Sequence, residues 1–404
     1  MKYFVLLTDG AGDNPIEKLH FRTPLEVASK PTMDFLAAGG EVGNVCTIPD
    51  GMSAGSEVAN LSVMGYAPEK YLTGRSPLEA ASIGVHMKDT DVSFRVNFVT
   101  LEGDGIYENL IITDHSSGDI TTEESDILLR DIAKVFENEN LKFYTGVSYR
   151  HCMVIGNGSL EGKFVPPHDI LEKRIGDYLP KGDNIGYFVD MMKKSHEILK
   201  NHPINRDRIS RGLNPANSLW LWGQGTKPNL PIFEKKNGLK AAVISAVDLI
   251  KGIAICADME SIDVEGATGT LHTNYEGKAQ AAIEAFERGV DYVYLHVEAT
   301  DECGHQGDID GKIKAIEYTD RKILKPVFEY LKQCGEDFSI LLLPDHKTPI
   351  AIRTHSADSV PFVIYRSNQR RQFDEDRKYT ELCGSKGVSF SDGPKLSDYF
   401  IFNK

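Results

Sequence analysis

The chain has 404 residues, of which 41% are hydrophobic, 26% charged and 9% aromatic, a composition typical of a globular enzyme with two or three domains. These values exclude a disordered, collagen-like or coiled-coil chain. The 45 basic and 59 acidic residues give a formal net charge of −14. This charge disfavours general binding to nucleic acid or to anionic membranes, because both require basic surfaces.

The first predicted element is a short apolar strand at residues 3–7. The polar pair Thr8-Asp9 follows at once, so the run is too short for a signal peptide, and no other apolar run reaches the length of a membrane span. The six cysteines are scattered and form no CxxC motif. This pattern indicates free thiols and predicts a cytoplasmic protein.

A glycine-rich loop near residues 50–55 leads into a predicted helix at residues 57–64, so Ser56 lies where that helix begins. Serine is favoured as an N-cap, because its hydroxyl accepts a hydrogen bond from a free backbone N–H. The same position also suits a nucleophile or a phosphate site, because helix N-termini attract anions and a metal-bound hydroxyl is nucleophilic near neutral pH. This segment alone is compatible with both interpretations.

The middle of the chain has a different pattern. A hairpin is predicted from the strand-like runs at residues 92–100 and 106–112, which a Gly- and Asp-containing turn separates. Amphipathic helices are predicted at residues 121–137 and 186–200. Residues 201–231 are rich in Asn, Pro and Gly and are interpreted as a return connection.

Apolar strands and helices alternate again in the last part of the chain. The strands are predicted at residues 241–245, 292–297, 339–343 and 361–365, and the helices at 279–288 and 312–332. Continuous apolar strands alternating with helices predict a mostly parallel sheet with helices on both faces. We therefore expect an α/β core of residues 1–80 and 232–404, interrupted by an inserted α+β domain of residues 81–231.

Acidic and histidine residues follow the ends of several predicted core strands. They are Asp9 after the first strand, Asp301 and His305 after residues 292–297, Asp345 and His346 after residues 339–343, and His355 before the last strand. Turn chemistry explains each of them alone. Ligands of open α/β sheets bind beyond the carboxyl ends of the strands, however, so the repeated placement predicts a common site.

The residue types indicate a metal site. A mixed set of carboxylates and imidazoles suits Mn, Zn, Fe or Co, whereas an all-oxygen set would suit Mg or Ca better. Asp301 and His305 are four residues apart and can share one ion. The set exceeds the needs of one tetrahedral ion, and two ions roughly 3.5–4 Å apart can hold a transferring phosphoryl group.

These motifs together resemble the alkaline phosphatase superfamily and, more closely, the cofactor-independent phosphoglycerate mutases of the archaeal type. The similar segments run along nearly the whole chain. They include residues 7–12 (LTDGAG), 55–60 (GSEVAN), 73–80 (TGRSPLEA), 94–98 (FRVNF), 238–244 (GLKAAVI), 295–305 (LHVEATDECGH), 345–346 (DH) and 355–358 (HSAD). The resemblance implies a metal-bearing core with an inserted substrate-binding cap domain.

The resemblance also implies roles for individual residues. One divalent ion would be held by Asp301, His305 and His355, and the other by Asp9, Asp345, His346 and the Ser56 oxygen. Mn is the first choice of metal, with Zn, Co and Fe as alternatives. Ser56 would take the phosphoryl group from 3-phosphoglycerate and return it to the 2-hydroxyl, a reaction of glycolysis that passes through a phosphoserine.

The substrate's carboxylate and phosphate require cationic partners, and the planar guanidinium group of arginine binds both in bidentate fashion. The candidates are Arg206, Arg208 and Arg211 in the segment before residue 212, Lys240 as a catalytic lysine by its motif, and His151 and His168 as cap residues. We expect at most one of the two histidines to act as an acid or base.

Two departures from the mutase pattern leave alternatives open. Asn60 stands where these mutases often have His, and Lys347 stands where Ser often follows the Asp-His pair. A similar bacterial branch has been proposed to act as a homoserine kinase, although no GxxxxGK[ST] loop for ATP is present here. A phosphatase or phosphodiesterase is a further alternative, and a purely metal-binding protein would leave Ser56 without a role.

Overall fold

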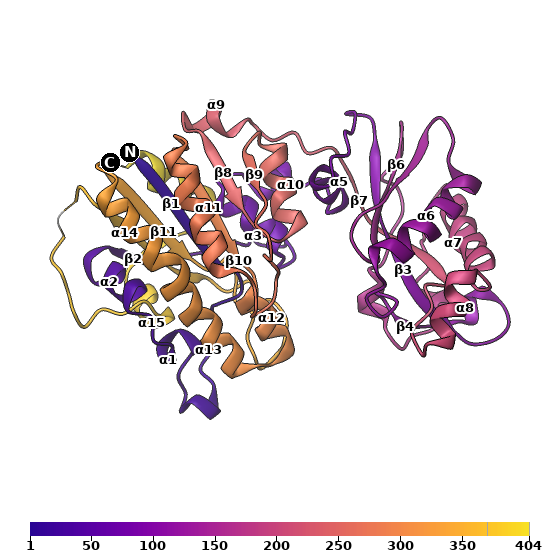
Figure 1. Ribbon diagram of the computed structural model, residues 1–404, viewed down its shortest axis with the longest axis horizontal. Coiled ribbons are helices and arrows are strands. Elements are labelled where there is room, and N and C mark those ends of the chain that lie inside the picture. Colours follow the sequence, from indigo (N-terminus) through magenta and orange to yellow (C-terminus); the bar gives the residue numbers. More distant parts are fainter. Residues whose placement is uncertain (370, 404) are drawn as a thin grey trace. The chain divides into compact units, whose positions relative to one another are not determined.

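The computed structural model describes residues 1–369 and 371–403, and the chain forms two compact units (Figure 1). Unit 1 consists of Met1–Leu72 and Asn229–Lys404, and unit 2 of Thr73–Pro228. The second unit begins at Thr73 and ends at Pro228, whereas the sequence analysis set the insertion at residues 81–231. Among the residues described, no helix combines the length and apolar character needed to cross a bilayer.

Within the described residues, unit 1 is built on an eight-stranded sheet. Its strands are β1 (Lys2–Thr8), β2 (Glu41–Val45), β8 (Ala241–Ile244), β9 (Glu260–Ile262), β10 (Tyr292–Val297), β11 (Phe338–Leu343), β12 (Val360–Arg366) and β13 (Val388–Phe390). The order is β13-β2-β12-β11-β1-β10-β8-β9. Strand β1 pairs in parallel with β10 and β11, and β10 with β8, whereas β12 is antiparallel to its neighbours β11 and β2. The predicted mostly parallel α/β sheet is confirmed.

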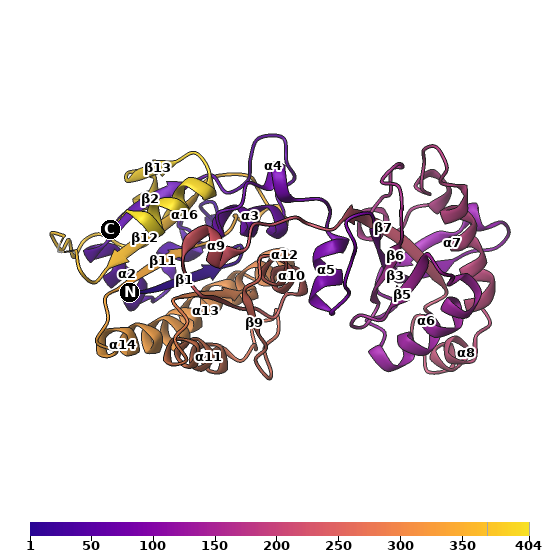
Figure 2. The ribbon, with the colours of Figure 1, turned by 90° about the horizontal axis from the view of Figure 1, so that it is seen from above.

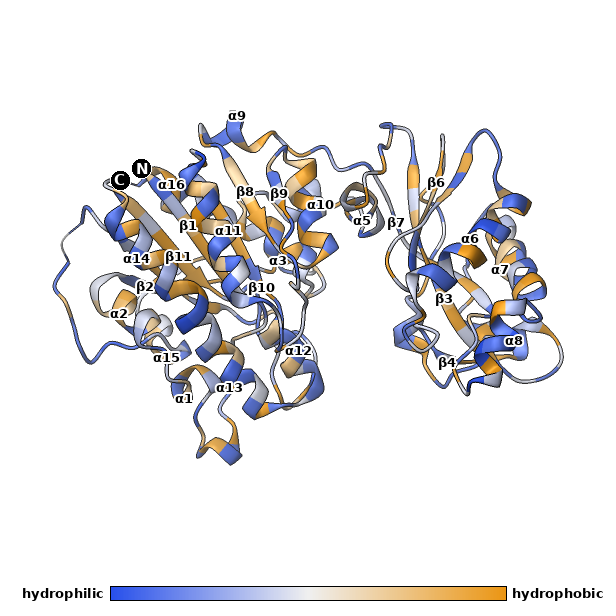
Figure 3. Cartoon of the chain, in the orientation of Figure 1, coloured by the Kyte–Doolittle hydropathy of each residue, from blue (hydrophilic) through white to orange (hydrophobic). Residues whose placement is uncertain are grey.

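Helices pack on both faces of this sheet (Figures 1 and 2). They are α1 (Pro24–Val27), α2 (Pro31–Gly39), α3 (Ser56–Val63), α4 (Pro68–Tyr71), α9 (Phe233–Asn237), α10 (Asp248–Cys256), α11 (Tyr275–Glu287), α12 (Ala299–Gln306), α13 (Ile309–Tyr318), α14 (Lys325–Gln333), α15 (Glu381–Ser385) and α16 (Gly393–Phe402). Successive side chains of a strand point to opposite faces. The Phe4 ring accordingly lies 6.4 Å from Phe286 of α11, and the Tyr3 ring 5.5 Å from Phe400 of α16. Coverage on both faces explains why the central strands are continuously hydrophobic (Figure 3).

Unit 2 is an antiparallel α+β unit with a five-stranded sheet. Its elements are β3 (Val92–Glu102), β4 (Ile111–Asp114), β5 (Leu141–Tyr144), β6 (Arg150–Ile155), β7 (Ser218–Thr226), α5 (Ser76–Ser82), α6 (Thr122–Phe136), α7 (Gly186–Leu199) and α8 (Pro203–Ser210). The predicted hairpin corresponds to β3 and β4, which pair antiparallel, and the second strand begins later than expected. Strand β3 also pairs with β6 and β7.

The return connection predicted at residues 201–231 contains two regular elements, helix α8 and strand β7. Helix α8 starts with Pro203 at its first position, where the missing N–H costs nothing. Strand β7 then lies along β3 and buries its two tryptophans, and the Nε1 of Trp220 donates a hydrogen bond to the carbonyl of Val165 at 2.8 Å. The high local content of Asn, Pro and Gly concealed two short elements whose apolar residues complete the core of unit 2.

A buried lysine forms an ion pair and hydrogen bonds with two of the loops that follow strands of the unit 1 sheet. The Nζ of Lys312 on α13 lies 2.7 Å from Asp13, and it also donates to the carbonyl oxygens of Gly12 and Thr348. Both side chains of the ion pair are almost fully buried. Residues 12 and 13 follow β1, and Thr348 follows β11, so this cation holds both loops against one helix.

Replacing Lys312 with methionine should lower the free energy of unfolding by about 3–5 kcal/mol, because the Asp13 carboxylate would remain buried without a partner. The measurement is urea denaturation, followed through the transition of unit 1. The matched control is Lys314→Met, an exposed lysine on the same helix, which should change stability by no more than about 0.5 kcal/mol. Equal midpoints for the two variants would contradict the role of Lys312.

Candidate functional site

The structure brings all the predicted metal ligands and the predicted nucleophile into one cluster within unit 1. They are Asp9 after β1, Asp301 and His305 in the first and last turns of α12, Asp345 and His346 after β11, His355 in the loop before β12, and Ser56 at the start of α3. Strands β1, β10 and β11 run parallel, so their carboxyl ends meet at one edge of the sheet.

One half of the cluster consists of Asp301, His305 and His355. The two carboxylate oxygens of Asp301 lie 3.2 Å from Nε2 of His305 and 3.3 Å from Nε2 of His355. The Nδ1 atoms of these rings face the carbonyl oxygens of Arg353 and Ala54 at 3.0 and 2.8 Å. A carbonyl can only accept, so each Nδ1 carries a proton, and in the neutral ring the Nε2 lone pair points toward Asp301.

The two Nε2 atoms of His305 and His355 are only 3.0 Å apart. Two lone pairs and a carboxylate that converge on one point require a cation, which can be a proton or a metal ion. Hydrogen bonding to Asp301 accordingly raises the pKa of His305 to about 9. A metal ion at this point would displace that proton.

The other half consists of Asp9, Asp345 and His346, all buried. Asp345 accepts hydrogen bonds from the backbone N–H groups of Gly10 and His346 at 3.1 and 2.8 Å. The Oδ1 of Asp9 is buried and has no hydrogen-bond partner among the described residues. Burial and the carboxylates of Asp345 and Asp301 raise the pKa of Asp9 well above its usual range, so a cation here would relieve an electrostatic cost.

The donor set therefore fits metal binding at two points. Ligand atoms of Asp301, His346 and His355 lie within 4.8 Å of one another, and so do those of Asp9, Asp345 and His346. The sequence analysis had assigned His346 to only one ion, whereas its ring borders both groups. Its ring centroid lies 4.0 Å from that of His355, and its Nε2 lies 3.5 Å from Asp9.

Ser56 is the first residue of α3, and Gly55 is the N-cap. The alternative interpretation of Ser56 as the helix N-cap is therefore excluded, because no side chain caps this helix. The Ser56 hydroxyl instead lies 3.2 Å from Nε2 of His346. The predicted nucleophile thus faces the ligand cluster.

Asn60, the departure from the mutase pattern, lies one helical turn after Ser56 and is fully buried. Its Nδ2 donates to the Ser56 carbonyl at 2.9 Å and to Asp345 at 3.0 Å, and its Oδ1 accepts from the Tyr294 hydroxyl at 2.6 Å. The asparagine therefore connects the nucleophile's backbone to a ligand. The i, i+4 spacing from Ser56 was the signal for this role.

Three residues that were not predicted from the sequence contact the predicted ligands. Thr348 donates a hydrogen bond to Asp301, and Thr47 donates to the carbonyl of Asp345. His296 lies 2.9 Å from Asp9. It was overlooked because it lies inside β10 rather than after a strand end.

The structure does not bring Lys240 to this cluster. Lys240 is exposed and precedes β8, and its backbone pairs with Asp291 just before β10. Strands β8 and β10 are parallel, so Lys240 lies at the amino edge of the sheet, opposite the ligands. The geometry gives its predicted catalytic role no support. The lysine that follows β8 at the carboxyl edge is Lys251 on α10, whose Nζ lies 2.5 Å from Asp263.

The predicted arginines of unit 2 are mostly engaged within that unit. Arg208 is buried, and its guanidinium group donates to Glu124 and to the carbonyls of Ser117 and Asn214. Arg211 pairs with Glu124 and Asp207, and Arg206 is exposed on α8. Arg208 serves to hold unit 2 together, so its geometry does not support substrate binding.

The two predicted cap histidines lie in different environments. His151 is buried in β6 against Phe98, and its Nδ1 accepts a hydrogen bond from Gly146 N–H. His168 is partly exposed and its ring lies 5.2 Å from that of Trp222. Of the two, only His168 is accessible enough to meet a ligand.

A cluster of arginines that the sequence analysis used only as family markers surrounds Glu79 in unit 2. Arg95 and Arg75 lie 2.6 and 3.1 Å from the same Glu79 oxygen. Arg95 also lies 4.8 Å above the ring of Trp222. Burial alone would raise the pKa of Glu79, but Arg95, Arg75 and the more distant Arg150 lower it overall. Three guanidinium groups thus act on one carboxylate.

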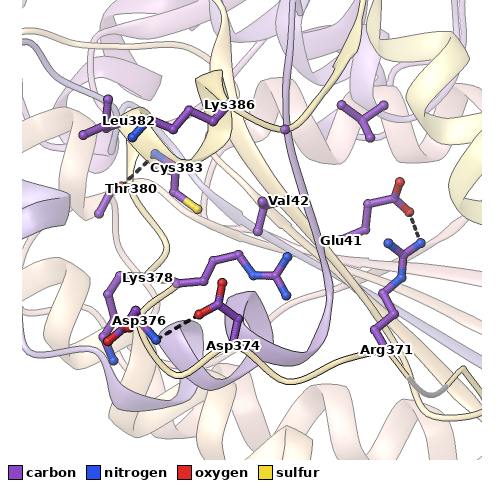
Figure 4. A pocket seen from close by; sticks show the side chains of 13 residues that line it. Glu41, Val42, Arg371, Asp374, Asp376, Lys378, Thr380, Leu382, Cys383 and Lys386 are labelled. Atoms are coloured by element: carbon purple, nitrogen blue, oxygen red, sulfur yellow. Dashed lines mark hydrogen bonds and ion pairs between the residues drawn. The ribbon is translucent and has the colours of Figure 1, made fainter.

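A cavity of about 740 Å³ lies elsewhere in unit 1, beside β2 and α15 (Figure 4). Arg371 pairs there with Glu41 at 2.7 Å, and Asp374, Lys378 and Lys386 lie around it. None of its described lining residues belongs to the ligand cluster. This cavity and the ligand cluster are therefore different places in unit 1.

The buried His151 predicts a pH dependence of stability. Burial lowers its pKa to about 3 from the usual 6.5, so below pH 6.5 the unfolded chain binds a proton that the folded chain does not. From this group alone, stability should fall by about 2 kcal/mol between pH 7 and pH 5. Urea denaturation at both pH values should show this loss in the wild type, and a loss smaller by that amount in His151→Gln. Equal losses in both proteins would refute the prediction.

Comparisons with known proteins agree with this geometry. The family model described as 2,3-bisphosphoglycerate-independent phosphoglycerate mutase matches residues 37–205. Relatives with that name from Methanosarcina barkeri and Methanothrix thermoacetophila are 49% and 50% identical, each over 96% of both chains. A solved protein of Pyrococcus horikoshii superimposes with a TM-score of 0.79 at 31% identity, over 100% of this chain and 98% of its own. The cofactor-independent phosphoglycerate mutase of Thermoplasma acidophilum gives a TM-score of 0.65 at 26% identity, with 99% of each chain covered. The chain therefore belongs to the 2,3-bisphosphoglycerate-independent phosphoglycerate mutase family.

Proposed function

We propose that this protein is an isomerase that interconverts 3-phosphoglycerate and 2-phosphoglycerate through a phosphoserine at Ser56. One observation carries the proposal: the Ser56 hydroxyl lies 3.2 Å from His346, inside a buried set of carboxylates and imidazoles. A purely metal-binding protein would need no hydroxyl at that point.

We further propose that the cluster holds two divalent ions, with Mn as the first choice. One ion would be held by Asp301, His305 and His355, and the other by Asp9, Asp345, His346 and the Ser56 oxygen. When bound, such ions supply positive charge that stabilises a transferring phosphoryl group and makes the serine hydroxyl a better nucleophile.

The residues of the chain itself account for the covalent steps. The Ser56 oxygen forms a bond to phosphorus as the bond to the substrate's 3-oxygen breaks; Ser56 loses its proton, and the released 3-hydroxyl gains one. In the second half, the substrate's 2-oxygen forms a bond to phosphorus as the Ser56 O–P bond breaks; the 2-hydroxyl loses its proton and the Ser56 oxygen regains one. The backbone N–H groups at the start of α3 favour the phosphoryl group at this position.

We propose that unit 2 binds the substrate's anionic groups, through Arg75, Arg95 and Arg150 rather than through Arg208. Their common effect on Glu79, whose pKa all three lower, supports this grouping. Guanidinium groups suit both the carboxylate and the phosphate of phosphoglycerate. His168 beside Trp222 is the better of the two histidine candidates, since it is the more exposed.

The homoserine kinase alternative rested mainly on Asn60. Its hydrogen bonds to Asp345 and to the Ser56 backbone give this residue a role that does not depend on the substrate. We therefore prefer the mutase. We also propose a cytoplasmic location, which the free thiols of Cys46, Cys152, Cys303, Cys334 and Cys383 support.

Ser56→Ala should abolish the conversion of 3-phosphoglycerate to 2-phosphoglycerate, by about 10³-fold or more, because no nucleophile remains. The measurement is an enolase-coupled assay of the metal-loaded protein without ATP. The matched control is Ser53→Ala in the same loop, an exposed serine whose loss should leave the rate nearly unchanged.

Three outcomes of this assay would contradict the proposal. Activity retained in Ser56→Ala would remove the serine from the mechanism. Phosphate release without 2-phosphoglycerate would indicate a hydrolase. ATP-dependent phosphorylation of homoserine by the wild type would restore the kinase alternative.

Asp345→Asn should lower the amount of Mn²⁺ that remains bound after dialysis, because a buried carboxylate charge among the ligands is lost. Metal content is measured by atomic emission. Asp358→Asn, an exposed acid three residues after His355, is the control and should retain the wild-type content. Unchanged stoichiometry in Asp345→Asn would contradict its role as a ligand.

A further inference from the structure

A chain of buried polar groups runs behind Asp9, across three adjacent strands. His296 lies in β10, Asp9 follows β1 on one side of it, and Ser245 follows β8 on the other. The Nε2 of His296 is 2.9 Å from Oδ2 of Asp9, and its Nδ1 is 3.2 Å from the Ser245 hydroxyl. None of the three side chains is more than 3% exposed.

The hydrogen bonds determine which ring nitrogen carries the proton. With a cation beside its other oxygen, the Asp9 carboxylate would be ionised and could only accept, so Nε2 of His296 would donate to it. In a neutral ring Nδ1 must then accept, and the Ser245 hydroxyl is its donor. The backbone N–H of Val247 donates to the Ser245 oxygen at 3.0 Å, which leaves the hydroxyl proton for the ring.

The same contacts exclude His296 as a metal ligand. Both of its ring nitrogens are engaged, one by Asp9 and one by Ser245, so no lone pair is left for an ion. Its backbone is also held, because the buried Lys278 donates from Nζ to the His296 carbonyl at 3.0 Å. The ring is thus fixed in position and in tautomer.

The two oxygens of Asp9 are consequently not equivalent. Oδ2 is occupied by His296, whereas Oδ1 is buried, lacks a partner among the described residues and lies 3.5 Å from Nε2 of His346. We propose that His296, oriented by Ser245, is a positioning residue that presents Asp9 to the metal through Oδ1. This inference rests on the metal-binding role proposed above for Asp9.

Two substitutions of His296 distinguish the effect of its Nε2–H donor from the effect of its size. The side-chain amide of glutamine reaches the place of Nε2 and can still donate to Asp9. The shorter asparagine reaches only the place of Nδ1, so it can meet Ser245 but not Asp9. When the metal-free protein is titrated with Mn²⁺ by calorimetry, His296→Asn should weaken one ion by about 10- to 100-fold, and His296→Gln should keep most of the affinity.

The matched control is Tyr379→Phe, which removes another buried hydrogen bond of unit 1, from the Tyr379 hydroxyl to the Pro361 carbonyl. It should leave the Mn²⁺ affinity unchanged even if it lowers stability. In an Asp9→Asn background, His296→Asn should cause no further loss, because the two changes act on one ligand. Equal affinities in wild type and His296→Asn, or equal losses in the Asn and Gln variants, would overturn the proposal.

Ser245→Ala tests the same chain with a smaller change, should His296→Asn fail to fold. A weaker Mn²⁺ affinity supports the orienting role of Ser245, and an unchanged affinity overturns it. Failure of the wild type to bind Mn²⁺ or to isomerise 3-phosphoglycerate would instead overturn the proposed function. The wild-type titration therefore distinguishes the two failures before any variant is measured.

Discussion

Mutual repulsion among buried carboxylates is the constraint on which the site of unit 1 depends. Asp9, Asp301 and Asp345 are all buried at one edge of the sheet. Burying several ionised carboxylates together is costly unless hydrogen-bond donors or cations compensate. The loops around them supply donors to Asp345 and Asp301, and His305, whose pKa is raised to about 9, supplies one positive charge beside Asp301. The cluster still lacks the positive charge needed to compensate three buried carboxylates, and divalent ions would supply it.

The fold satisfies this constraint with short chain segments that come from distant parts of the sequence. Parallel strands deliver the ligands to one edge, and Lys312 holds two of the ligand-bearing loops against α13. Behind the ligands, Asn60 and His296 each donate one N–H to a carboxylate. Such contacts orient a ligand before the metal arrives, which lowers the cost of ordering it on binding.

The core and the grouping of its acidic and histidine residues could be predicted from sequence, because both depend on local patterns. The run at β10 is apolar except for His296 and the run at β11 is almost wholly apolar, and an acid or histidine follows each strand end. By contrast, Lys240 directly precedes β8, so it lies at the amino edge of the sheet, whereas the ligand cluster lies at the carboxyl edge. The sequence around Arg208 does not indicate that its guanidinium group donates hydrogen bonds to Glu124 and to two carbonyls. The cluster of Arg75, Arg95 and Arg150 needs the pairing of β3 with β6, which no single segment encodes.

The bare start of α3 has a consequence for the covalent intermediate. Helix termini leave backbone N–H groups without partners, and here no side chain covers them. The oxygens of a phosphoryl group on Ser56 would accept hydrogen bonds from these N–H groups and so cap the helix that Ser56 begins. The first turn of α3 would then be less stable in the unphosphorylated enzyme, and phosphorylation of Ser56 would stabilise it. The amide hydrogens of residues 56 and 57 would exchange with solvent more slowly while the ester persists.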